Sequence, residues 1–313
     1  MNINEVLSRL HELRAIPIVV QELMAALGAS DVDIDDLARK ISRDQALFAT
    51  VLRVANSSFY GFSRKISSMH EAVLVMGLAG VRSLVLSAGL VHALGRDRRG
   101  AHRVEYWQRS FRVASYAKVI AGRLKQSPEA GFAAGLLHNI GQIIAEICLP
   151  ERYAEVLAKV EADGSDLIAT EEEMLGFHHG TLGAEVARRW NFPSEIEHAI
   201  RYCHVLTDSN SISKVKQGGD ERATKTVHLA RLGASEEANA VSPMKWNWNE
   251  DASELLTIAI SMAVRIDRGD PPEQVLALLP QSVRKVYGLD ADWLAVNLPP
   301  RDQLEQGIAD LLA

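Results

Sequence analysis

Residues 135–150 read GLLHNIGQIIAEICLP and lie near the middle of a chain of 313 residues. Their apolar side chains recur every three or four positions, as Leu136, Ile140 and Ile143 do. This is the period of an α-helix with one buried face, so we predict a single helix over residues 129–147. The pair His138-Asn139 places two polar side chains that could carry chemistry among these apolar residues.

The helical period continues along the whole chain. Alternation of the kind that marks a β-strand does not persist anywhere for more than about four residues. We predict further helices at 69–76, 78–94, 104–125, 150–163, 165–175, 180–190 and 193–204. Short connections between such helices favour a compact bundle in which neighbours run antiparallel. The predicted fold class is therefore all-α, a multi-helix bundle with an additional C-terminal helical region.

One polar stretch interrupts this pattern and suggests a domain boundary. Residues 208–222 read DSNSISKVKQGGDER, which is typical of an exposed loop or linker. We predict a helical bundle over residues 1–206 and a linker or loop over 207–222. Residues 223–313 form a C-terminal helical region that packs on the bundle or extends it.

Composition and charge exclude several classes of protein. Lys and Arg total 34 against 40 Asp and Glu, so the net charge of −6 argues against a globally basic nucleic-acid binder. Cys148 and Cys203 are too few for a disulfide scaffold, and a reducing cytoplasm is expected. Residues 72–94 are apolar enough to span a membrane, but Arg82 lies near their centre. We therefore expect a buried helix pair broken near Gly77, and no membrane association.

Histidines supply most of the candidate site residues. His138 is followed by Asn139, His178 and His179 are adjacent, and His204 comes later in the chain. A hydrolytic metal site in a helical bundle needs several such ligands from different helices, usually with at least one carboxylate. No carboxylate stands out in the sequence close to these histidines.

Several segments in a fixed order resemble a known family. They include NSSFYG at 56–61, GLLHNIG at 135–141 and EEEMLGFHHGTLGAEVARRW at 171–190. From about residue 7 to residue 204 the chain resembles the HDOD family, an output-domain branch related to the HD-domain metal-dependent phosphohydrolases. The resemblance implies a helical HD-like bundle and a role in bacterial signal transduction.

The resemblance also implies that the ancestral metal site is degenerate. Active HD phosphohydrolases use a His, then a His-Asp pair, then a late Asp. The corresponding positions here hold Arg109, the pair His138-Asn139, and Arg231. Only His138 matches the ligand expected at its position.

These replacements predict a site without catalysis. Carboxylates supply much of the attraction that holds Mg²⁺ or Mn²⁺, and an arginine close by adds repulsion because it stays protonated. Without the ion, a bound water also keeps its high pKa and is a poor nucleophile. We expect no catalytic residue, no metal and no other cofactor, and we interpret the four positions as a remnant.

Two other uses of these residues stay open. A divalent metal could be held without carboxylates by a histidine-rich set, namely His138, His178, His179 and His204. A phosphate or carboxylate could instead bind at the remnant site, through Arg109, Arg231 and His138. Each of these side chains could instead serve packing, capping or an internal ion pair.

The leading hypothesis is a cytoplasmic regulatory module that binds protein partners in a signalling pathway, with no nucleic-acid partner. The alternative is a metal-dependent phosphohydrolase that acts on a nucleotide or phosphate ester. A third hypothesis is a small-anion sensor that uses the remnant site. The set of metal ligands separates the first hypothesis from the second.

Overall fold

The structure is a computed structural model, which describes residues 3–8, 22, 39, 41, 45–56, 65–94, 101–190, 192–204, 252–279 and 281–305. Its elements are helices throughout, which confirms the predicted all-α class. The helices of the first part are α1 (Ile3–Ser8), α4 (Gln45–Ala55), α5 (Met69–Leu94), α6 (Ala101–Arg123), α7 (Pro128–Leu137), α8 (Ile140–Cys148), α9 (Pro150–Asp163), α10 (Leu167–Leu175), α11 (His179–Arg189) and α12 (Ser194–Tyr202). Those of the second part are α15 (Ala252–Arg268), α16 (Pro272–Leu276), α17 (Gln281–Tyr287) and α18 (Ala291–Asn297).

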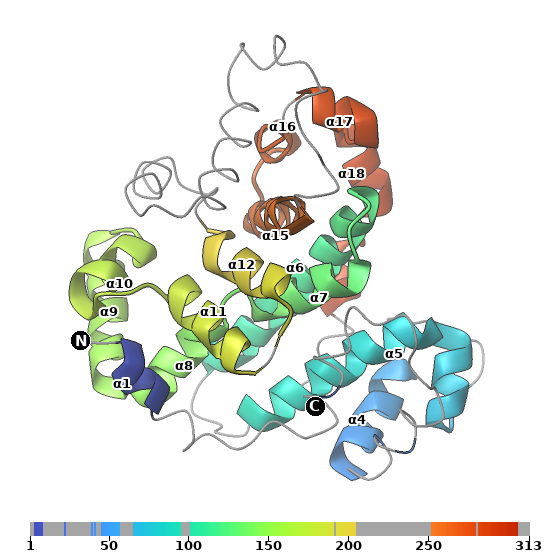
Figure 1. Cartoon of the computed structure of the whole chain (residues 1–313), viewed down its shortest axis with the longest axis horizontal. Helices are drawn as coiled ribbons and strands as arrows, with labels where there is room; N and C mark the ends of the chain where they lie inside the picture. The colour runs from blue at the N-terminus through green and yellow to red at the C-terminus, as the bar shows by residue number, and fades with distance from the viewer. Residues whose placement is uncertain are drawn as a thin grey trace.

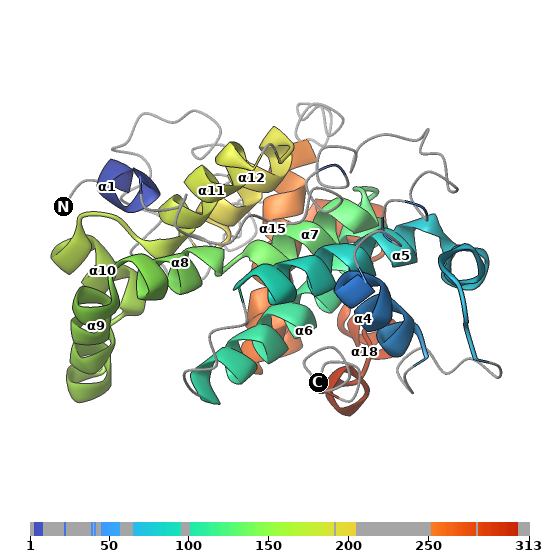
Figure 2. The same ribbon diagram turned by 90° about the horizontal axis from the view of Figure 1, so that it is seen from below.

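Helices α6 and α7 lie at the centre of the molecule (Figure 1). Helices α8 to α12 extend to one side of this pair, with α9 and α10 at the far end, while α4 and α5 lie on the other side (Figures 1 and 2). Helix α15 packs against α6, α12 and α7, and so joins the second part of the chain to the first. The hydrophobic core is continuous through both parts.

Small residues bring α6 and α7 close together. Gly131 lies against Ala117, and one turn further along α7 Gly135 lies against Ala114. The two helices therefore run antiparallel, and each step towards the end of α7 meets an earlier turn of α6. Ser110 lies one turn before Ala114 on α6. By the same register it comes level with His138 and Asn139, which follow α7.

The predicted helix over 129–147 is wrong in one respect, because the structure divides it at His138 and Asn139. The ring of His138 donates from Nδ1 to the carbonyl oxygen three residues earlier, at 2.7 Å, and Asn139 leaves the helical region with φ −110° and ψ 13°. The next helix then approaches α11 so closely that a side chain at Gly141 would collide with the backbone of His179. This contact between distant segments sets the direction of α8.

Helix α5 is broken at Gly77, as expected from the sequence. Gly77 has φ 75° and ψ 160°, which an L-residue rarely adopts. Among the described residues, no single helix has both the length and the apolar character needed to cross a membrane. The side chain of Arg82, near the middle of this apolar stretch, lies outside the described residues.

Polar contacts fix α15 onto the first part of the chain. Arg112 on α6 forms a buried ion pair with Asp267 on α15. Ser261 on α15 donates to the carbonyl oxygen of Cys203, at 2.7 Å. The predicted linker over 207–222 lies outside the described residues, so the domain boundaries stay a prediction.

Candidate functional site

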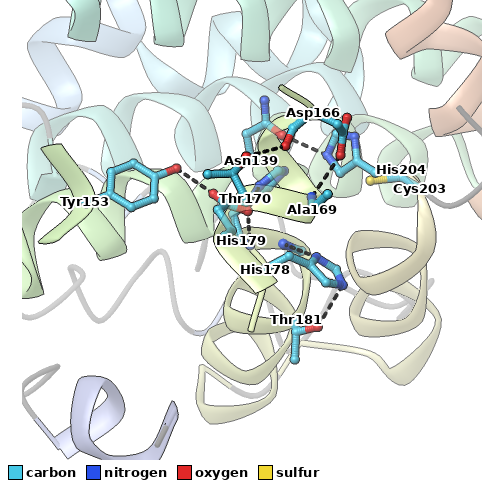
Figure 3. A network of polar contacts seen from close by, with 12 residues as sticks. Asn139, Tyr153, Asp166, Ala169, Thr170, His178, His179, Thr181, Cys203 and His204 are labelled. Atoms are coloured by element: carbon cyan, nitrogen blue, oxygen red, sulfur yellow. Dashed lines mark hydrogen bonds and ion pairs between the residues drawn. The ribbon is translucent and has the colours of Figure 1, made fainter. Parts of the chain in front are cut away.

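Four buried polar residues meet where three connections of the bundle come together. His138 and Asn139 separate α7 from α8, His179 begins α11, and His204 follows α12. The ring centroids of His179 and His204 are 4.7 Å apart, and those of His138 and His204 are 5.8 Å apart. We call these four residues the histidine cluster; Figure 3 shows Asn139, His179 and His204 facing one another.

A buried carboxylate orients His179. Glu171 on α10 accepts hydrogen bonds from the backbone N–H of His179 at 2.8 Å and from its ring Nδ1 at 2.7 Å. The hydroxyl of Tyr153 donates to the other carboxylate oxygen at 2.7 Å. Burial acts to raise the pKa of Glu171, but the charge and hydrogen bonds of His179 outweigh it, so this pKa lies below its ordinary value.

Sequence reasoning missed Glu171, although a signal was present. Glu171, Glu172 and Glu173 are consecutive, but only Glu171 is four residues from both Leu167 and Leu175. That spacing puts it on the apolar face of α10, where a carboxylate needs partners. The structure confirms its complete burial.

Burial keeps the other two histidines uncharged near neutral pH. Burial, together with the charge of Arg109, lowers the pKa of His138 to about 3. Burial and the neighbouring rings of His179 and His138 lower the pKa of His204 well below its ordinary value. The histidine cluster is therefore neutral at these two rings.

The hydrogen-bond partners decide which ring nitrogens carry protons. Nδ1 of His138 faces the carbonyl oxygen of Gly135, and Nδ1 of His179 faces a carboxylate oxygen, so both must donate. Nε2 of His204 faces Oδ1 of Asn139 at 2.9 Å and must also donate. The neutral ring of His138 therefore carries a lone pair on Nε2. Within the described part of the chain neither this atom nor Nε2 of His179 has a hydrogen-bond partner.

The predicted set of four histidine ligands is only partly brought together. His178 lies at the edge of the group and caps α11, where its Nδ1 accepts from the N–H of Gly180 at 3.1 Å. Its Nε2 is 3.0 Å from the hydroxyl of Thr181 (Figure 3). Both ring nitrogens of His178 are thus engaged away from His138 and His204.

The donor set does not fit the metal of the HD phosphohydrolases. At the pair position, Asn139 offers an amide oxygen that already accepts from His204. Across the described ranges, no three His, Cys, Asp or Glu side chains are arranged to hold a metal ion. The positive charge of Arg109 also acts on His138 and opposes a cation there.

Arg109 lies beside the histidine cluster and also close to Asp267 on α15. Its Nε is 3.7 Å from Asp267, whereas Arg112 bonds to the same carboxylate directly. The side chain of Arg109 is 37% exposed, and its Nε has no hydrogen-bond partner among the described residues. Arg231, the third residue of the predicted anion site, lies outside the described residues.

Comparison with known proteins gives one family and one curated relative. The family model of the HDOD domain matches residues 13–206. An uncharacterized protein of Treponema pallidum (strain Nichols) is 27% identical over 203 residues, which are 63% of this chain. The match covers only 39% of the length of that relative.

Solved structures of similar fold cover nearly the whole chain. An HDOD domain protein with unknown function from Geobacter sulfurreducens is 20% identical, with a TM-score of 0.68 over 97% of both chains. A Shewanella amazonensis SB2B protein named "Putative phosphohydrolase" is 24% identical, with a TM-score of 0.66 over 99% of this chain and 98% of its own. A Marinobacter aquaeolei VT8 protein named "Putative signal transduction protein" is 22% identical, with a TM-score of 0.67 over 98% of this chain and 61% of its own. At these identities the likeness establishes the fold.

Proposed function

The chain belongs to the HDOD domain family, and we propose that it is a regulatory module that binds protein partners in a cytoplasmic signal-transduction pathway and catalyses no hydrolysis. One observation carries the second half of this proposal. Where an HD phosphohydrolase has the Asp of its His-Asp pair, this chain has Asn139, whose side-chain oxygen accepts a hydrogen bond from His204.

Two described carboxylates close to this place, Glu171 and Asp267, are already engaged. Glu171 accepts hydrogen bonds from Tyr153 and from His179. Asp267 pairs with Arg112 and lies close to Arg109. A divalent cation held by either carboxylate would have to displace a buried partner and leave it unpaired, which is costly.

The names of the structural neighbours support two different functions. The Marinobacter aquaeolei protein carries a signal-transduction name, which supports a regulatory role. The Shewanella amazonensis protein carries a phosphohydrolase name, which supports the alternative. We favour the regulatory role because the two arginines and Asn139 replace ligands that hydrolysis requires, whereas a scaffold needs only the fold.

A hydrolysis assay tests the proposal. The full chain is incubated with phosphomonoesters and cyclic dinucleotides in the presence of Mn²⁺, Mg²⁺ or Fe²⁺, and released product is measured. We expect no turnover above that of a buffer blank. Turnover that disappears in a His138→Ala variant of retained fold would overturn the proposal, whereas turnover that survives this substitution originates outside the remnant site.

A further inference from the structure

A buried nitrogen atom of the histidine cluster needs a hydrogen-bond donor. Nε2 of His138 is inaccessible to solvent, and no described polar group reaches it. Its tautomer is fixed by the carbonyl oxygen of Gly135 at the opposite ring nitrogen, and burial keeps the ring neutral. Buried polar atoms in folded proteins nearly always have partners, so this lone pair points to a bound group that donates.

A metal cation does not suit this place. Arg109 and Arg268 both place positive charge near the cluster, since both contribute, after burial, to the lowered pKa of His138. The same charges repel a cation and attract an anion. A fully deprotonated anion is also unsuited, because its oxygens would face the lone pair on Nε2 of His138.

Donors for an anion lie on the neighbouring helix. Nε of Arg109 has no hydrogen-bond partner in the described ranges. The hydroxyl of Ser110, whose side chain is fully buried, interacts with Tyr106 one turn away but makes no hydrogen bond of good geometry to any described group. Ser110 is one turn before Ala114, which packs against Gly135, and this register brings it level with His138. Nε2 of His138 and the donors Arg109 and Ser110 therefore lie on facing elements.

We propose that the histidine cluster, together with Arg109 and Ser110, binds a phosphate group that carries a proton. The P–OH donates to Nε2 of His138, and the charged oxygens accept from Arg109 and Ser110. No bond is made or broken in the ligand. Free phosphate and a phosphomonoester share this chemistry. The inference rests on the proposed function, because only a site without catalysis can hold such a group as a signal.

Calorimetric titration of the full chain with four probes tests this inference. The probes are inorganic phosphate, methyl phosphate, dimethyl phosphate and sulfate. Near pH 6 the first two carry a removable proton, since the second pKa of a phosphomonoester is about 6, whereas the last two carry none. We expect phosphate or methyl phosphate to bind at least about tenfold more tightly than sulfate and dimethyl phosphate. Binding should weaken towards about pH 8 as that proton is lost.

Matched variants locate the site. Arg109→Gln removes a partly exposed charge, and Ser110→Ala removes only a hydroxyl; each should weaken phosphate binding about tenfold or more. The control is Arg188→Gln, which removes the same charge from a side chain that is 59% exposed and pairs with Glu185 on α11. This control should leave binding unchanged. Circular dichroism and thermal unfolding establish that each variant is folded.

Three results would overturn the inference. Equal affinity for sulfate and phosphate would mean that charge alone selects the ligand. Unchanged binding in both Arg109→Gln and Ser110→Ala would place the ligand elsewhere, and absence of binding in the millimolar range would mean that no such site exists. None of these results bears on hydrolysis or on partner binding. Conversely, release of phosphate from methyl phosphate would overturn the proposed function.

Discussion

At the scale of single residues, Glu171 makes the hydrogen bonds that fix the position of His179. Its two oxygens accept from Tyr153 and from two N–H groups of His179, all of them buried. These bonds connect α9, α10 and the start of α11. The position and tautomer of His179 therefore depend on a carboxylate that is distant from the His138-Asn139 pair in the sequence.

Replacing Glu171 by Ala should be strongly destabilising. The change leaves three buried donors without acceptors, and breaking a buried pair of this kind costs about 3–5 kcal/mol. The matched control is Glu173→Ala on the same helix, since Glu173 is 67% exposed and pairs with Lys159 at the surface. An exposed pair contributes about 1 kcal/mol or less. Urea unfolding of both variants measures the difference, and similar losses in the two would contradict the assigned role of Glu171.

Acid should destabilise the fold before the carboxylates titrate. Burial lowers the pKa of His138 to about 3 and, with the charge of His179, that of His178 to about 4, whereas a histidine in the unfolded chain has a pKa of about 6.5. Below about pH 6.5 the unfolded chain takes up protons that the folded chain excludes. Above about pH 6.5 the neutral histidines make their full contribution to the free energy of unfolding. This contribution is lost as the pH falls towards the pKa values of His138 and His178 in the folded chain.

The expected slope is about 1.4 kcal/mol per pH unit for each such histidine. Unfolding free energies measured at several pH values between about 6.5 and about 5 check this, because ordinary carboxylates stay ionised in that range. A His178→Gln variant should show a shallower slope. A flat profile in the unsubstituted chain would show that the buried histidines are protonated in the folded state.

At the scale of helices, local signals account for most of the boundaries. Helix α9 matches its predicted range of 150–163, because Pro150 begins it and Gly164 ends it with φ 68°. Side chains also mark helix starts, as Ser127 and Asp166 do by accepting from backbone N–H groups. Such signals are readable from sequence because they act within a few residues.

The break between α7 and α8 could not be read in the same way. It depends on the contact of Gly141 with His179, residues that are far apart in the chain. The role of Glu171 and the pairing of Asp267 with Arg112 likewise depend on contacts between distant helices. The sequence thus named the histidines of the site, while their carboxylate partners required the structure.

Substituting Gly141 tests the importance of this helix contact. Gly141→Ala should cost at least about 1–3 kcal/mol, because the added methyl group collides with the backbone of His179. The control is Gly122→Ala on α6, where the new methyl group makes only ordinary contact with Pro128. That change should be neutral or stabilising by up to about 1 kcal/mol through helix propensity. Thermal unfolding compares the two, and equal stability would mean that α8 can move away from α11 without cost.

At the scale of the whole molecule, α15 joins the second part of the chain to the bundle. It contacts α6, α7 and α12, and its Asp267 and Ser261 make buried polar contacts with Arg112 and Cys203. We expect this packing to make the two parts dependent on each other, even though the family match ends at residue 206.

Limited proteolysis tests this dependence. The polar composition of residues 208–222 predicts that the first cut falls there. The two fragments should nevertheless elute together in size-exclusion chromatography, because the interface with α15 is buried. Fragments that separate without denaturant would contradict this account of the molecule, and a first cut within 104–140 would contradict the predicted boundaries.

The central claim is that the remnant site has lost its affinity for a catalytic metal. The most direct test is calorimetric titration of Mn²⁺ into the full chain and into an Arg109→His, Asn139→Asp double variant. The double variant removes one positive charge and adds one carboxylate beside His138, so it should bind Mn²⁺ more tightly than the unsubstituted chain. We predict no saturable binding to the unsubstituted chain at micromolar Mn²⁺. Tight binding to the unsubstituted chain that is lost in His138→Ala would contradict the claim.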